Sequence, residues 1–391
     1  MKIVVVGGGS GGHITPTIAV ASEIKKQQSN TELEYILGRG DKLSDVVKEK
    51  DIFENVHHVF SGKFRRFHGG GLLQFLDIPT TLKNIRDMFL VLIGFVQSVL
   101  LLRKLKPDAL FIKGGFVGVP VGLAAALLKI PFVTHDSDAV PGLANRIIGR
   151  WAAKHAVAMP VEHYSYPKGR TTQVGNPVSD KYTLVTAALQ KSYKESFGLP
   201  SDAQVVFVTG GGLGAHRLNM SVAALAKQLL GRHPQAVILH ISGRGKEDEV
   251  IQAYAKALNE SELERVVLEP FVTDMYRYSG AADVSVVRAG ANTLAELATQ
   301  AKACIIVPNP QLTGGHQLKN AELLKERGAV TIVDDEAVSK NPELLLQQIE
   351  ALLDSPQKRL ELARNLHSTS FEDSAQQLAQ IVLSVAEGQR Q

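Results

Sequence analysis

The feature that most constrains the fold is a glycine-rich turn close to the start of the sequence. Buried-strand residue types at Ile3 to Val6 run directly into the sequence Gly-Gly-Gly-Ser-Gly-Gly-His of residues 7–13. A continuous apolar run of this kind is typical of a parallel strand covered on both faces. Glycines allow a sharp turn, and a helix that follows directs free N–H groups and the positive end of its dipole outwards. The stretch therefore predicts a strand, a turn and a helix arranged to bind phosphate.

Two other interpretations of the same turn stay open. Residues 7–12 also fit the Gly-x-Gly-x-x-Gly fingerprint of dinucleotide-binding units, and the turn can equally be a tight connection with no ligand. In an NAD-binding unit the second strand ends in an acidic residue placed for the ribose. Here the second expected strand, residues 33–37, ends in Gly-Arg-Gly, and Asp41 follows slightly late. The dinucleotide interpretation is therefore weakened.

Length and composition limit the kind of protein. A chain of 391 residues is long for one hydrophobic core, so we expect two domains of roughly 150 to 200 residues each. A formal net charge of only +4 argues against a nucleic-acid-binding protein unless the basic residues are clustered. The single cysteine, Cys304, lies in an apolar run without a partner, so we expect a core residue and a reducing cytoplasm.

The second half of the chain repeats the plan of the first. Val205 to Thr209 predicts a strand, Gly210 to Ala215 forms a second glycine turn, and residues 217–230 predict a helix. We expect further strands at residues 110–113, 132–134, 156–158, 236–241, 266–268, 284–287, 303–307 and 330–333. We expect further helices at residues 16–26, 247–258, 293–300, 317–327 and 374–387.

These elements predict an α/β fold with two Rossmann-like, doubly wound parallel-sheet domains that face each other across a cleft. We expect an N-terminal domain at residues 1–175, which includes the last strand of the first half at 156–158. A C-terminal domain should follow at 176–365, and a C-terminal helix at 366–391 should pack back on the first domain.

A basic and apolar segment lies between the second and third strands expected in the first half. Residues 88–102 are almost wholly apolar, are too short to span a bilayer and are interrupted by Gly94, Gln97 and Ser98. One interpretation is a buried crossover helix. The other is an apolar patch on an anionic membrane surface, rimmed by Lys and Arg. The two interpretations are compatible if the helix is buried and an inserting tip is exposed. That tip would be formed by Leu72, Leu73, Phe75 and Leu76.

Several short motifs, taken together and in order, resemble one known family. They are Gly-Gly-Ser-Gly-Gly-His at 8–13, Lys-Gly-Gly-Phe-Val at 113–117, His-Asp-Ser-Asp at 135–138, Pro-Gly-Leu-Ala-Asn at 141–145, Val-Gly-Asn-Pro at 174–177, residues 210–215, residues 288–296, and His-Gln with Asn-Ala at 316–321. The chain resembles the MurG family of bacterial peptidoglycan glycosyltransferases along nearly its whole length. The resemblance implies the GT-B architecture of two Rossmann domains.

The resemblance also implies an activity, which is transfer of GlcNAc from UDP-GlcNAc to undecaprenyl-pyrophosphoryl-MurNAc-pentapeptide, converting lipid I to lipid II in peptidoglycan synthesis. The enzyme would be peripheral on the cytoplasmic face of the cell membrane. UDP-GlcNAc would be a substrate, and no tightly bound cofactor is expected. Three alternatives remain: a related UDP-sugar-dependent glycolipid synthase with another acceptor, a nucleotide-binding oxidoreductase, and a non-catalytic membrane adaptor.

Donor-binding residues are expected in the second half. Glu296 lies one turn into a helix, where its carboxylate can accept hydrogen bonds from two ribose hydroxyls, although a solvated helix residue is the alternative. By resemblance, the pyrophosphate would bind the amides of Gly211, Gly212, Leu213, Gly214 and Ala215, and the uracil would lie against Phe271 and Val272. Gln317 and Asn320 would hold the GlcNAc, and His316, a further donor-site candidate, lies near Asn320 on the same helix surface. Alternatively, His316, Gln317 and Asn320 form only a polar, capped helix start.

One donor residue departs from the family. A serine usually stands at the position of Gly212, and loss of its hydroxyl removes a phosphate contact of ~1 to 2 kcal/mol. Donor affinity is therefore in question.

Acceptor-binding residues are expected in the first half: Ser10, Gly11, Gly12, His13, Gly115, Phe116, Asp136, Asp138 and Asn145. His13 is the catalytic candidate, because an unperturbed imidazole with a pKa of ~6.5 can accept the proton of the attacking hydroxyl. Positioning of the acceptor and a structural role are its alternatives. Asp136 and Asp138 match a metal–nucleotide signature of another glycosyltransferase fold, but their place in this family favours hydrogen bonding to the acceptor, so no metal is expected.

The expected reaction is an inverting, metal-independent single displacement in which the acceptor hydroxyl attacks the anomeric carbon as UDP leaves. The turn amides would stabilise the developing charge. Arg288 either assists them or serves as a structural ion-pair partner.

Overall fold

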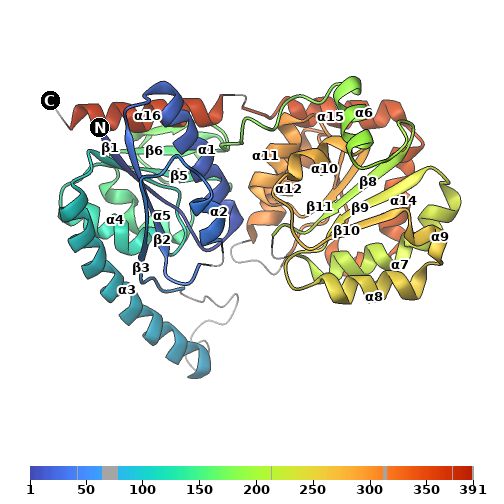
Figure 1. Ribbon diagram of the computed structural model, residues 1–391, viewed down its shortest axis with the longest axis horizontal. Helices are drawn as coiled ribbons and strands as arrows, with labels where there is room; N and C mark the ends of the chain where they lie inside the picture. The colour runs from blue at the N-terminus through green and yellow to red at the C-terminus, as the bar shows by residue number, and fades with distance from the viewer. Residues whose placement is uncertain (42, 64–77, 213, 311–314, 372, 390–391) are drawn as a thin grey trace. The chain divides into compact units, whose positions relative to one another are not determined.

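The computed structural model describes residues 1–41, 43–63, 78–212, 214–310, 315–371 and 373–389. The chain forms two compact units, which are Met1–Ser179 together with Phe371–Gln391 (unit 1) and Asp180–Ser370 (unit 2). Figure 1 shows that each unit has a sheet with helices on both faces. Because each unit has its own sheet and its own core, each is described separately.

Unit 1 contains a seven-stranded sheet whose pairings are all parallel. In spatial order its strands are β3 (Asn55–Val59), β2 (Glu32–Gly38), β1 (Lys2–Val6), β4 (Ala109–Ile112), β5 (Phe132–Asp136), β6 (Lys154–Val157) and β7 (Thr171–Gln173). The strand order reverses between β1 and β4, and Val6 pairs in register with Ile112. Doubly wound sheets bind ligands at this kind of reversal, beyond the carboxyl ends of the strands.

The helices of unit 1 connect these strands and cover both faces of the sheet (Figure 1). They are α1 (Gly11–Gln27), α2 (Ser44–Lys48), α3 (Ile78–Leu105), α4 (Gly118–Leu127), α5 (Leu143–Ile148), the 3-10 turns η2 (Gly149–Trp151), η3 (Val161–His163) and η4 (Lys168–Arg170), and α16 (Ser374–Gly388). Helix α16 packs against α1, where Gln27 Nε2 donates to the carbonyl oxygen of Gln376 (3.1 Å). Leu378 and Val382 of α16 join the core cluster of Ile3 and Val5, so the end of the chain completes the first core.

The polar interruptions in α3 dock this helix onto the segment after β3. A Cβ atom on Gly94 would overlap the carbonyl oxygen of Phe60, so only glycine allows this close approach. Gln97 Oε1 accepts a hydrogen bond from the Phe60 N–H (2.9 Å), and Ser98 Oγ donates to the Gly94 carbonyl (2.7 Å). Phe95, Val99 and Leu102 pack into the core cluster of β1 and β4. One face of α3 is therefore a buried crossover face, as one interpretation of residues 88–102 predicted.

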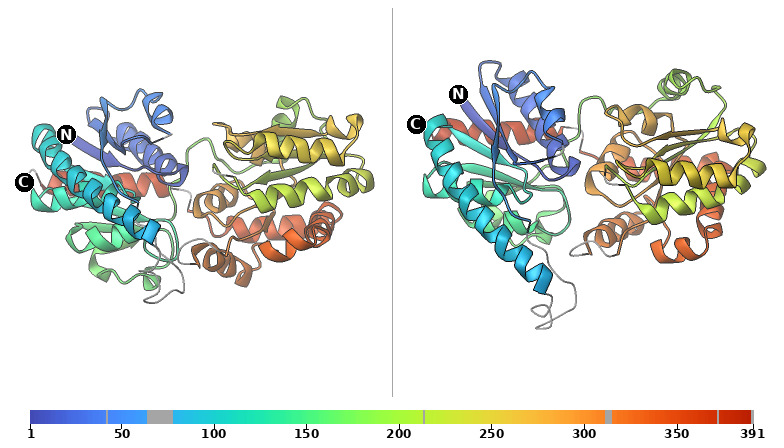
Figure 2. Two further views of the ribbon diagram at one scale, coloured as in Figure 1. Left: turned by 90° about the horizontal axis from the view of Figure 1, so that it is seen from below. Right: turned by 60° about the horizontal axis from the view of Figure 1, so that its bottom comes forward.

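The opposite face of α3 is exposed. It carries a row of large apolar side chains with exposed fractions between 45% and 62%, which we call the α3 stripe: Leu82, Ile85, Met88, Phe89, Leu92, Ile93, Val96 and Leu100. Figures 1 and 2 show that the amino-terminal half of α3 extends beyond the sheet of unit 1. By length and composition alone, Pro79–Leu105 qualifies as a helix that could cross a membrane, and its most apolar window of 18 residues has a mean hydropathy of 2.0. The apolar run of residues 88–102, which was predicted to be too short to span a bilayer, is thus part of a longer helix that begins at Ile78.

Unit 2 contains a six-stranded parallel sheet. In spatial order its strands are β10 (Val266–Glu269), β9 (Ala236–Ile241), β8 (Gln204–Thr209), β11 (Val284–Val287), β12 (Cys304–Ile306) and β13 (Thr331–Ile332). The order reverses between β8 and β11, where Thr209 pairs with Val287. The second glycine turn therefore lies beside the segment that begins at Arg288.

The helices of unit 2 surround this sheet (Figure 1). They are α6 (Ala187–Ser196), α7 (His216–Arg232), α8 (Glu247–Ala257), α9 (Glu260–Leu263), α10 (Met275–Ala281), α11 (Ala291–Thr299), α12 (His316–Glu326), α13 (Asp335–Lys340), α14 (Glu343–Leu353) and α15 (Pro356–His367). Cys304 is fully buried in β12, as its apolar surroundings predict.

The structure corrects the element assignment at several places, of which three bear on the site. The first half has a strand β7 after the one predicted to be its last, and β3 was not predicted. Helix α1 starts at Gly11 and not at Pro16, so it begins inside the glycine turn. The predicted inserting tip at residues 72–76 lies outside the described residues.

Candidate active site

The first glycine turn lies at the carboxyl end of β1, between β2 and β4. Gly9 has a φ of 86°, a backbone conformation that favours glycine. A Cβ atom there would also overlap the ring of Phe116, so both the conformation and the lack of space exclude a side chain. Its N–H donates to Asp41 Oδ2 (2.6 Å), and Asp41 Oδ1 accepts from the Leu43 N–H (3.0 Å). Asp41 therefore organises the turn, a role that its position in the sequence did not predict.

Helix α1 begins directly after this turn. Ser10 is the N-cap residue, its side chain makes no capping hydrogen bond, and no acidic residue stands in the first turn. Gly11 and Gly12 are exposed at the helix start. The positive end of a 17-residue helix is thus presented at the carboxyl edge of the sheet, which favours an anion or a neutral polar ligand there.

His13 lies in the first turn of α1, and its ring faces the Gly114–Gly115 turn that follows β4. A Cβ atom built on Gly115 would be 3.2 Å from His13 Cδ2 and 3.5 Å from Nε2. His13 Nδ1 is buried and has no hydrogen-bond partner in the described part of the chain. Burial, and then the charge of Lys113, lower the pKa of His13 to about 4. The imidazole is therefore neutral at pH 7 and able to accept a proton or a hydrogen bond.

Asp136 and Asn145 shape the loop after β5. Asp136 Oδ1 accepts from the Gly142 N–H (2.9 Å), and Oδ2 accepts from the Tyr166 hydroxyl (2.8 Å). Burial raises the pKa of the Asp136 carboxyl. Asn145 Nδ2 donates to the carbonyl oxygen of His135 (2.9 Å), while its buried Oδ1 has no partner among the described residues. Both oxygens of Asp136 thus accept hydrogen bonds within unit 1, whereas the Asn145 Oδ1 acceptor is not used by the described residues.

The remaining predicted acceptor residues lie around the same edge. Phe116 packs on Gly9, and Asp138 is partly exposed just beyond β5, where its carbonyl oxygen accepts from the Tyr164 hydroxyl (2.8 Å). His135 is fully buried and its Nε2 is 2.9 Å from the carbonyl oxygen of Gly175, consistent with a structural residue. The structure thus brings the acceptor candidates together at the reversal of strand order in unit 1.

The second glycine turn lies at the carboxyl end of β8. The Gly211 N–H donates to Thr209 Oγ1 (3.1 Å), and the Gly214 N–H donates to the Gly211 carbonyl (2.8 Å). Ala215 is the N-cap residue of α7 and provides no side-chain cap. Leu213 lies outside the described residues. The turn therefore leads into a 17-residue helix whose first turn carries no acidic side chain.

Phe271 lies beside this turn and contacts an arginine that the sequence analysis did not select. The guanidinium carbon of Arg244 is 3.9 Å from the centre of the Phe271 ring, a cation–π contact. The backbone N–H of Arg244 also donates to the Gly212 carbonyl oxygen (3.4 Å). Val272 is partly buried and packs against the core of unit 2. Phe271 of this pair thus adjoins the turn.

Glu296 lies on α11, after the segment that follows β11. Burial raises the pKa of its carboxyl to about 7, while a hydrogen bond with the Tyr182 hydroxyl opposes this shift. The same contact and burial raise the pKa of Tyr182. A carboxyl group that is only partly ionised at pH 7 can accept hydrogen bonds from hydroxyls, and Tyr182 is a second partner that sequence reasoning missed.

The sugar-binding candidates are held by the backbone around them. Gln317 Oε1 accepts from the Asn309 N–H (2.8 Å), and Asn320 Nδ2 donates to the Ala289 carbonyl (3.3 Å). Asn320 is almost fully buried. His316 opens α12, and its side chain is not among those described. Gln317 and Asn320 therefore connect the loops after β11 and β12.

The structure gives Arg288 an ion-pair partner, which is one of the two roles that the sequence analysis left open. Its Nη1 atom lies 2.6 Å from Asp335 Oδ1 and donates to the Val307 carbonyl (2.8 Å). Asp335 also pairs with Arg217 (3.2 Å). The guanidinium of Arg288 is almost fully buried, so its charge is neutralised inside unit 2.

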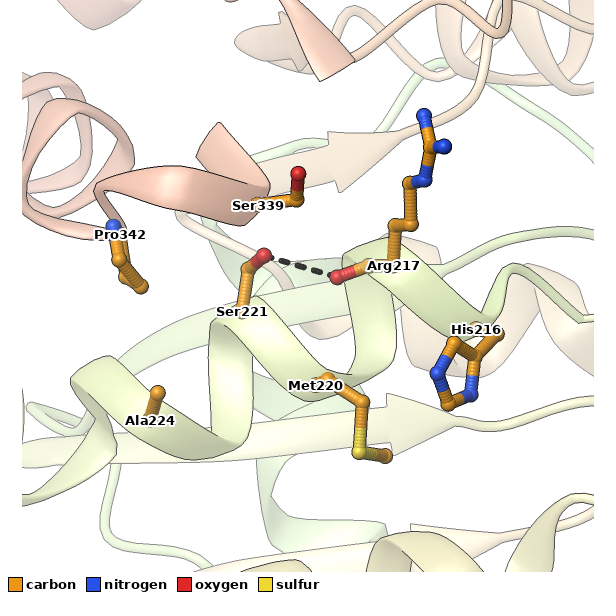
Figure 3. Close-up of a pocket in the computed structure, with 7 residues that line it drawn as sticks. All are labelled: His216, Arg217, Met220, Ser221, Ala224, Ser339 and Pro342. Atoms are coloured by element: carbon orange, nitrogen blue, oxygen red, sulfur yellow. Dashed lines mark hydrogen bonds between the residues drawn. The ribbon is translucent and has the colours of Figure 1, made fainter. Parts of the chain in front are cut away.

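A cavity of about 330 Å³ lies on the flank of α7 (Figure 3). It is lined by His216, Arg217, Met220, Ser221, Ala224, Ser339 and Pro342. None of the predicted donor residues lines it. In Figure 3 the Ser221 hydroxyl is used within the helix, where it donates to the Arg217 carbonyl (2.8 Å). The glycine turn at the sheet edge is therefore the better candidate for a nucleotide site, because the strand ends and the start of α7 converge there.

The fold and these turns match one class of enzyme. Residues 3–157 match the glycosyltransferase family 28 N-terminal domain, and residues 205–378 match the C-terminal domain of the same family. The two parallel-sheet units and the solved glycosyltransferases with this fold confirm the predicted GT-B class.

Individual relatives are more specific. The UDP-N-acetylglucosamine–N-acetylmuramyl-(pentapeptide) pyrophosphoryl-undecaprenol N-acetylglucosamine transferase of Lachnoclostridium phytofermentans is 32% identical over 95% of this chain and 96% of its own length. The enzyme of the same name from Acetivibrio thermocellus is 28% identical, covering 98% of both chains. The crystal structure of Acinetobacter baumannii MurG has a TM-score of 0.70 at 25% identity and covers 98% of this chain and 99% of that one. The chain belongs to the MurG family of N-acetylglucosamine transferases, as its motifs predicted.

Proposed function

We propose that this enzyme transfers GlcNAc from UDP-GlcNAc to undecaprenyl-pyrophosphoryl-MurNAc-pentapeptide, which converts lipid I to lipid II. The observation that carries the proposal is similarity along nearly the whole chain to several enzymes of that name. The two glycine turns support it, because both the donor and the acceptor of this reaction contain a pyrophosphate group. Each turn lies where the strand order of its sheet reverses.

The donor would bind to unit 2. Amides of the turn at 210–215 and the start of α7 would meet the pyrophosphate, and Phe271 would lie against the base with Arg244 on its ring. Glu296 would accept hydrogen bonds from the ribose hydroxyls, in competition with the Tyr182 hydroxyl. Arg288 is not part of this proposal, since its guanidinium is paired with Asp335.

The acceptor would bind to unit 1, with its diphosphate at the start of α1 and its sugar near Asn145 and Phe116. The neutral imidazole of His13 would accept the proton of the attacking hydroxyl as that oxygen bonds to the anomeric carbon and UDP leaves. This is a single displacement with inversion, so no enzyme nucleophile is needed. The turn amides of unit 2 would stabilise the charge that develops on UDP.

The lipid part of the acceptor implies a membrane surface, and the α3 stripe supports such a location. Its apolar side chains are flanked by exposed cations at Lys83, Arg86, Arg103 and Lys104, whereas the acidic residue of α3, Asp87, is buried and paired with Arg86 (2.7 Å). An apolar face bordered by positive charge suits the interface of an anionic leaflet. We therefore propose a peripheral association with the cytoplasmic face of the cell membrane through α3 and the adjoining predicted tip.

The test of the function is UDP release from UDP-GlcNAc with and without a short-chain lipid I analogue, repeated in EDTA. We expect release that depends on the acceptor and is unchanged by EDTA, because no step of the proposed displacement uses a metal. Tight donor binding without acceptor-dependent release would reject lipid I as the acceptor and favour another glycolipid. Release abolished by EDTA would contradict the metal-independent mechanism.

A further inference from the structure

The proposed displacement places new negative charge on the diphosphate of the donor. As the bond between the anomeric carbon and the β-phosphate oxygen breaks, its electron pair stays on that oxygen. The acceptor hydroxyl oxygen forms the new bond and gives its proton to the base, so UDP leaves with one more negative charge. The start of a helix supplies only about half an elementary charge. A cation near the diphosphate would therefore stabilise the transition state beyond what the turn amides and α7 provide.

The basic side chains at the start of α7 and after β11 are already paired with carboxylates of unit 2. Arg288, the cation considered from the sequence, lies 2.6 Å (Nη1 to Oδ1) from Asp335 and is almost fully buried. Arg217 Nη1 lies 3.2 Å from the other oxygen of the same carboxylate. His216 Nδ1 lies 2.9 Å from Glu249 Oε1. A cation for the diphosphate is therefore expected on another loop.

Arg244 lies on the loop after β9, beside the second glycine turn. Strand β9 stands between β8 and β10 in the sheet, so the loops after these three strands meet at one edge. The backbone N–H of Arg244 donates to the Gly212 carbonyl oxygen (3.4 Å). A Cβ atom on Gly214 would overlap the Ser242 carbonyl oxygen, so the loops after β8 and β9 are in direct contact. These contacts place Arg244 at the turn that leads into α7.

The side chain of Arg244 is directed by Phe271, on the loop after β10. Its guanidinium carbon is 3.9 Å from the centre of the Phe271 ring. A Cβ atom built on Gly212 would be 3.9 Å from Cε2 of the same ring, so one ring adjoins both the arginine and the turn. An aromatic face attracts a cation but does not neutralise its charge as a carboxylate does. Arg244 is also exposed, so its charge is accessible to a ligand.

Acidic side chains in the same region increase the need for a cation there. Glu247, Asp248 and Glu249 lie in the first turn of α8, which follows the Arg244 loop and packs against α7. Carboxylates at a helix start are stabilised in their charged form by that helix. They repel a diphosphate bound at the neighbouring turn, and the charge of Arg244 offsets part of this repulsion.

We propose that Arg244 is a donor-binding residue whose guanidinium, directed by the Phe271 ring, binds the diphosphate of UDP-GlcNAc and stabilises UDP as it leaves. The inference rests on the proposed function, because it names the cation that the same donor site uses. A guanidinium group suits this role, since its planar set of N–H donors binds two phosphate oxygens at once.

The experiment compares UDP with uridine, which lacks the diphosphate, as ligands of the full-length protein. Isothermal titration measures the Kd of UDP, and a titration followed by NMR measures that of uridine. Arg244→Met removes the charge and keeps a long side chain that can pack on Phe271, whereas Arg244→Lys keeps the charge. The matched control is Lys246→Met, which removes a charge from the same loop. Arg150→Met is a second control, because Arg150 makes a similar contact, 3.8 Å from the Trp151 ring centre, in unit 1.

We expect Arg244→Met to weaken UDP binding about 10- to 100-fold, as the loss of a charged hydrogen bond predicts, and to change uridine binding less than about twofold. Arg244→Lys should retain part of the UDP affinity, and both controls should bind UDP like the wild type. Equal losses for UDP and uridine would overturn the proposal, because Arg244 would then act only by placing Phe271. An equal loss of UDP affinity in Lys246→Met, or none in Arg244→Met, would also overturn it.

The activity readout separates this inference from the proposed function. If the wild type transfers GlcNAc to the lipid I analogue, kcat at saturating donor should fall about 100-fold in Arg244→Met and recover partly in Arg244→Lys. An unchanged kcat would overturn the role of Arg244 in stabilising the leaving UDP. If the wild type binds UDP but transfers nothing to the analogue, the proposed acceptor is wrong, while the comparison of UDP with uridine still decides whether Arg244 binds the diphosphate.

Discussion

Residues at the carboxyl ends of the strands differ in how much of their hydrogen-bonding capacity the protein itself uses. Asp136 and Arg288 are both held by several partners inside their own units. His13 Nδ1 and Asn145 Oδ1 are buried and without partners in the described ranges. A buried polar atom without a partner costs about 1–3 kcal/mol, so its persistence favours a ligand contact. We therefore expect substitutions of Asp136 to affect mainly stability, and substitutions of His13 and Asn145 to affect mainly function.

Gly212 provides a prediction about the donor. A Cβ atom at this position would meet only the Phe271 ring, at 3.9 Å, which is ordinary van der Waals contact. Gly212→Ser therefore fits without strain and supplies the hydroxyl group that the resemblance led us to expect at this position. We expect UDP to bind about 5- to 30-fold more tightly, since a hydrogen bond to a charged group contributes about 1–2 kcal/mol. Isothermal titration with UDP measures the change.

The matched control for this substitution is Gly231→Ser, near the end of α7. That glycine has no atom within 4 Å of a built Cβ, so the new serine is equally well accommodated but lies far along the helix from the turn. Its affinity for UDP should equal that of the wild type. Equal affinities for Gly212→Ser and the wild type would mean that the donor phosphates do not reach this turn.

At the scale of elements, the central strands were predictable because burial on both faces leaves a continuous apolar run. Strands β9 and β11 lie at the predicted residues, 236–241 and 284–287. The edge strands β3 and β7 were missed because their sequences, Asn-Val-His-His-Val and Thr-Thr-Gln, lack such a run. An edge strand is defined by pairing with its neighbour, and that information is not local.

The candidate site residues show the same difference between local and long-range information. The glycine turns and the residues next to them follow from local sequence, so the two sheet edges were predictable. Partners from distant segments were not: Asp41 for Gly9, Tyr182 for Glu296 and Asp335 for Arg288 are brought in by tertiary folding. Lys113 had a local signal, since a charged residue ends an apolar strand directly before a glycine pair, but that signal does not reveal that its ammonium group donates to Ser137 in the loop after β5.

Helix α3 supports a prediction about membrane binding. Replacing Leu92 and Val96 with serine removes two exposed apolar side chains from the α3 stripe without touching its core face. We expect binding to anionic vesicles to weaken at least about tenfold, since burial of each such side chain contributes about 1 kcal/mol or more. Sedimentation with anionic and with zwitterionic vesicles measures it, and activity on a short-chain soluble acceptor should be unchanged.

The control for α3 is a pair of equally exposed apolar residues elsewhere. Ile251 on α8 and Leu360 on α15 are 52% and 51% exposed, close to the 54% and 56% of Leu92 and Val96. The double substitution Ile251→Ser and Leu360→Ser should leave vesicle binding intact. Equal loss in both double variants would point to a general effect of surface hydrophobicity, and no loss in the α3 variant would reject the helix as the membrane contact.

At the scale of the whole molecule, the two units differ in their buried titratable groups. Among the described residues, unit 1 holds three buried histidines whose pKa is lowered, His13 and His155 to about 4 and His135 further, and one buried carboxyl with a raised pKa, Asp136. In unit 2, the pKa of His240 is lowered to about 3 and the pKa of Glu296 is raised to about 7. Burial is the first cause in every case.

These shifts predict that unit 1 loses more stability than unit 2 as the pH falls. A histidine that is neutral when folded and has a pKa of ~6.5 when unfolded contributes stability that is complete above pH 6.5 and is lost as the pH falls towards 4. Each contributes a slope of about 1.4 kcal/mol per pH unit in that window. A carboxyl with a raised pKa contributes stability that increases as the pH falls. In unit 2 the gain from Glu296 therefore offsets the loss from His240. In unit 1 the gain from Asp136 offsets the loss from only one of three histidines.

Trp151, the single tryptophan, makes this difference measurable because it lies in unit 1 and contacts Arg150, whose guanidinium carbon is 3.8 Å from its ring centre. During urea unfolding at pH 7.5 the fluorescence of Trp151 and the far-UV circular dichroism are expected to give similar midpoints. At pH 5 the fluorescence midpoint should fall below that of the circular dichroism, since the latter reports both units. His155→Gln removes one of the three titrating groups and should narrow the gap. Midpoints that stay together at pH 5 would mean that the two units do not differ in acid stability.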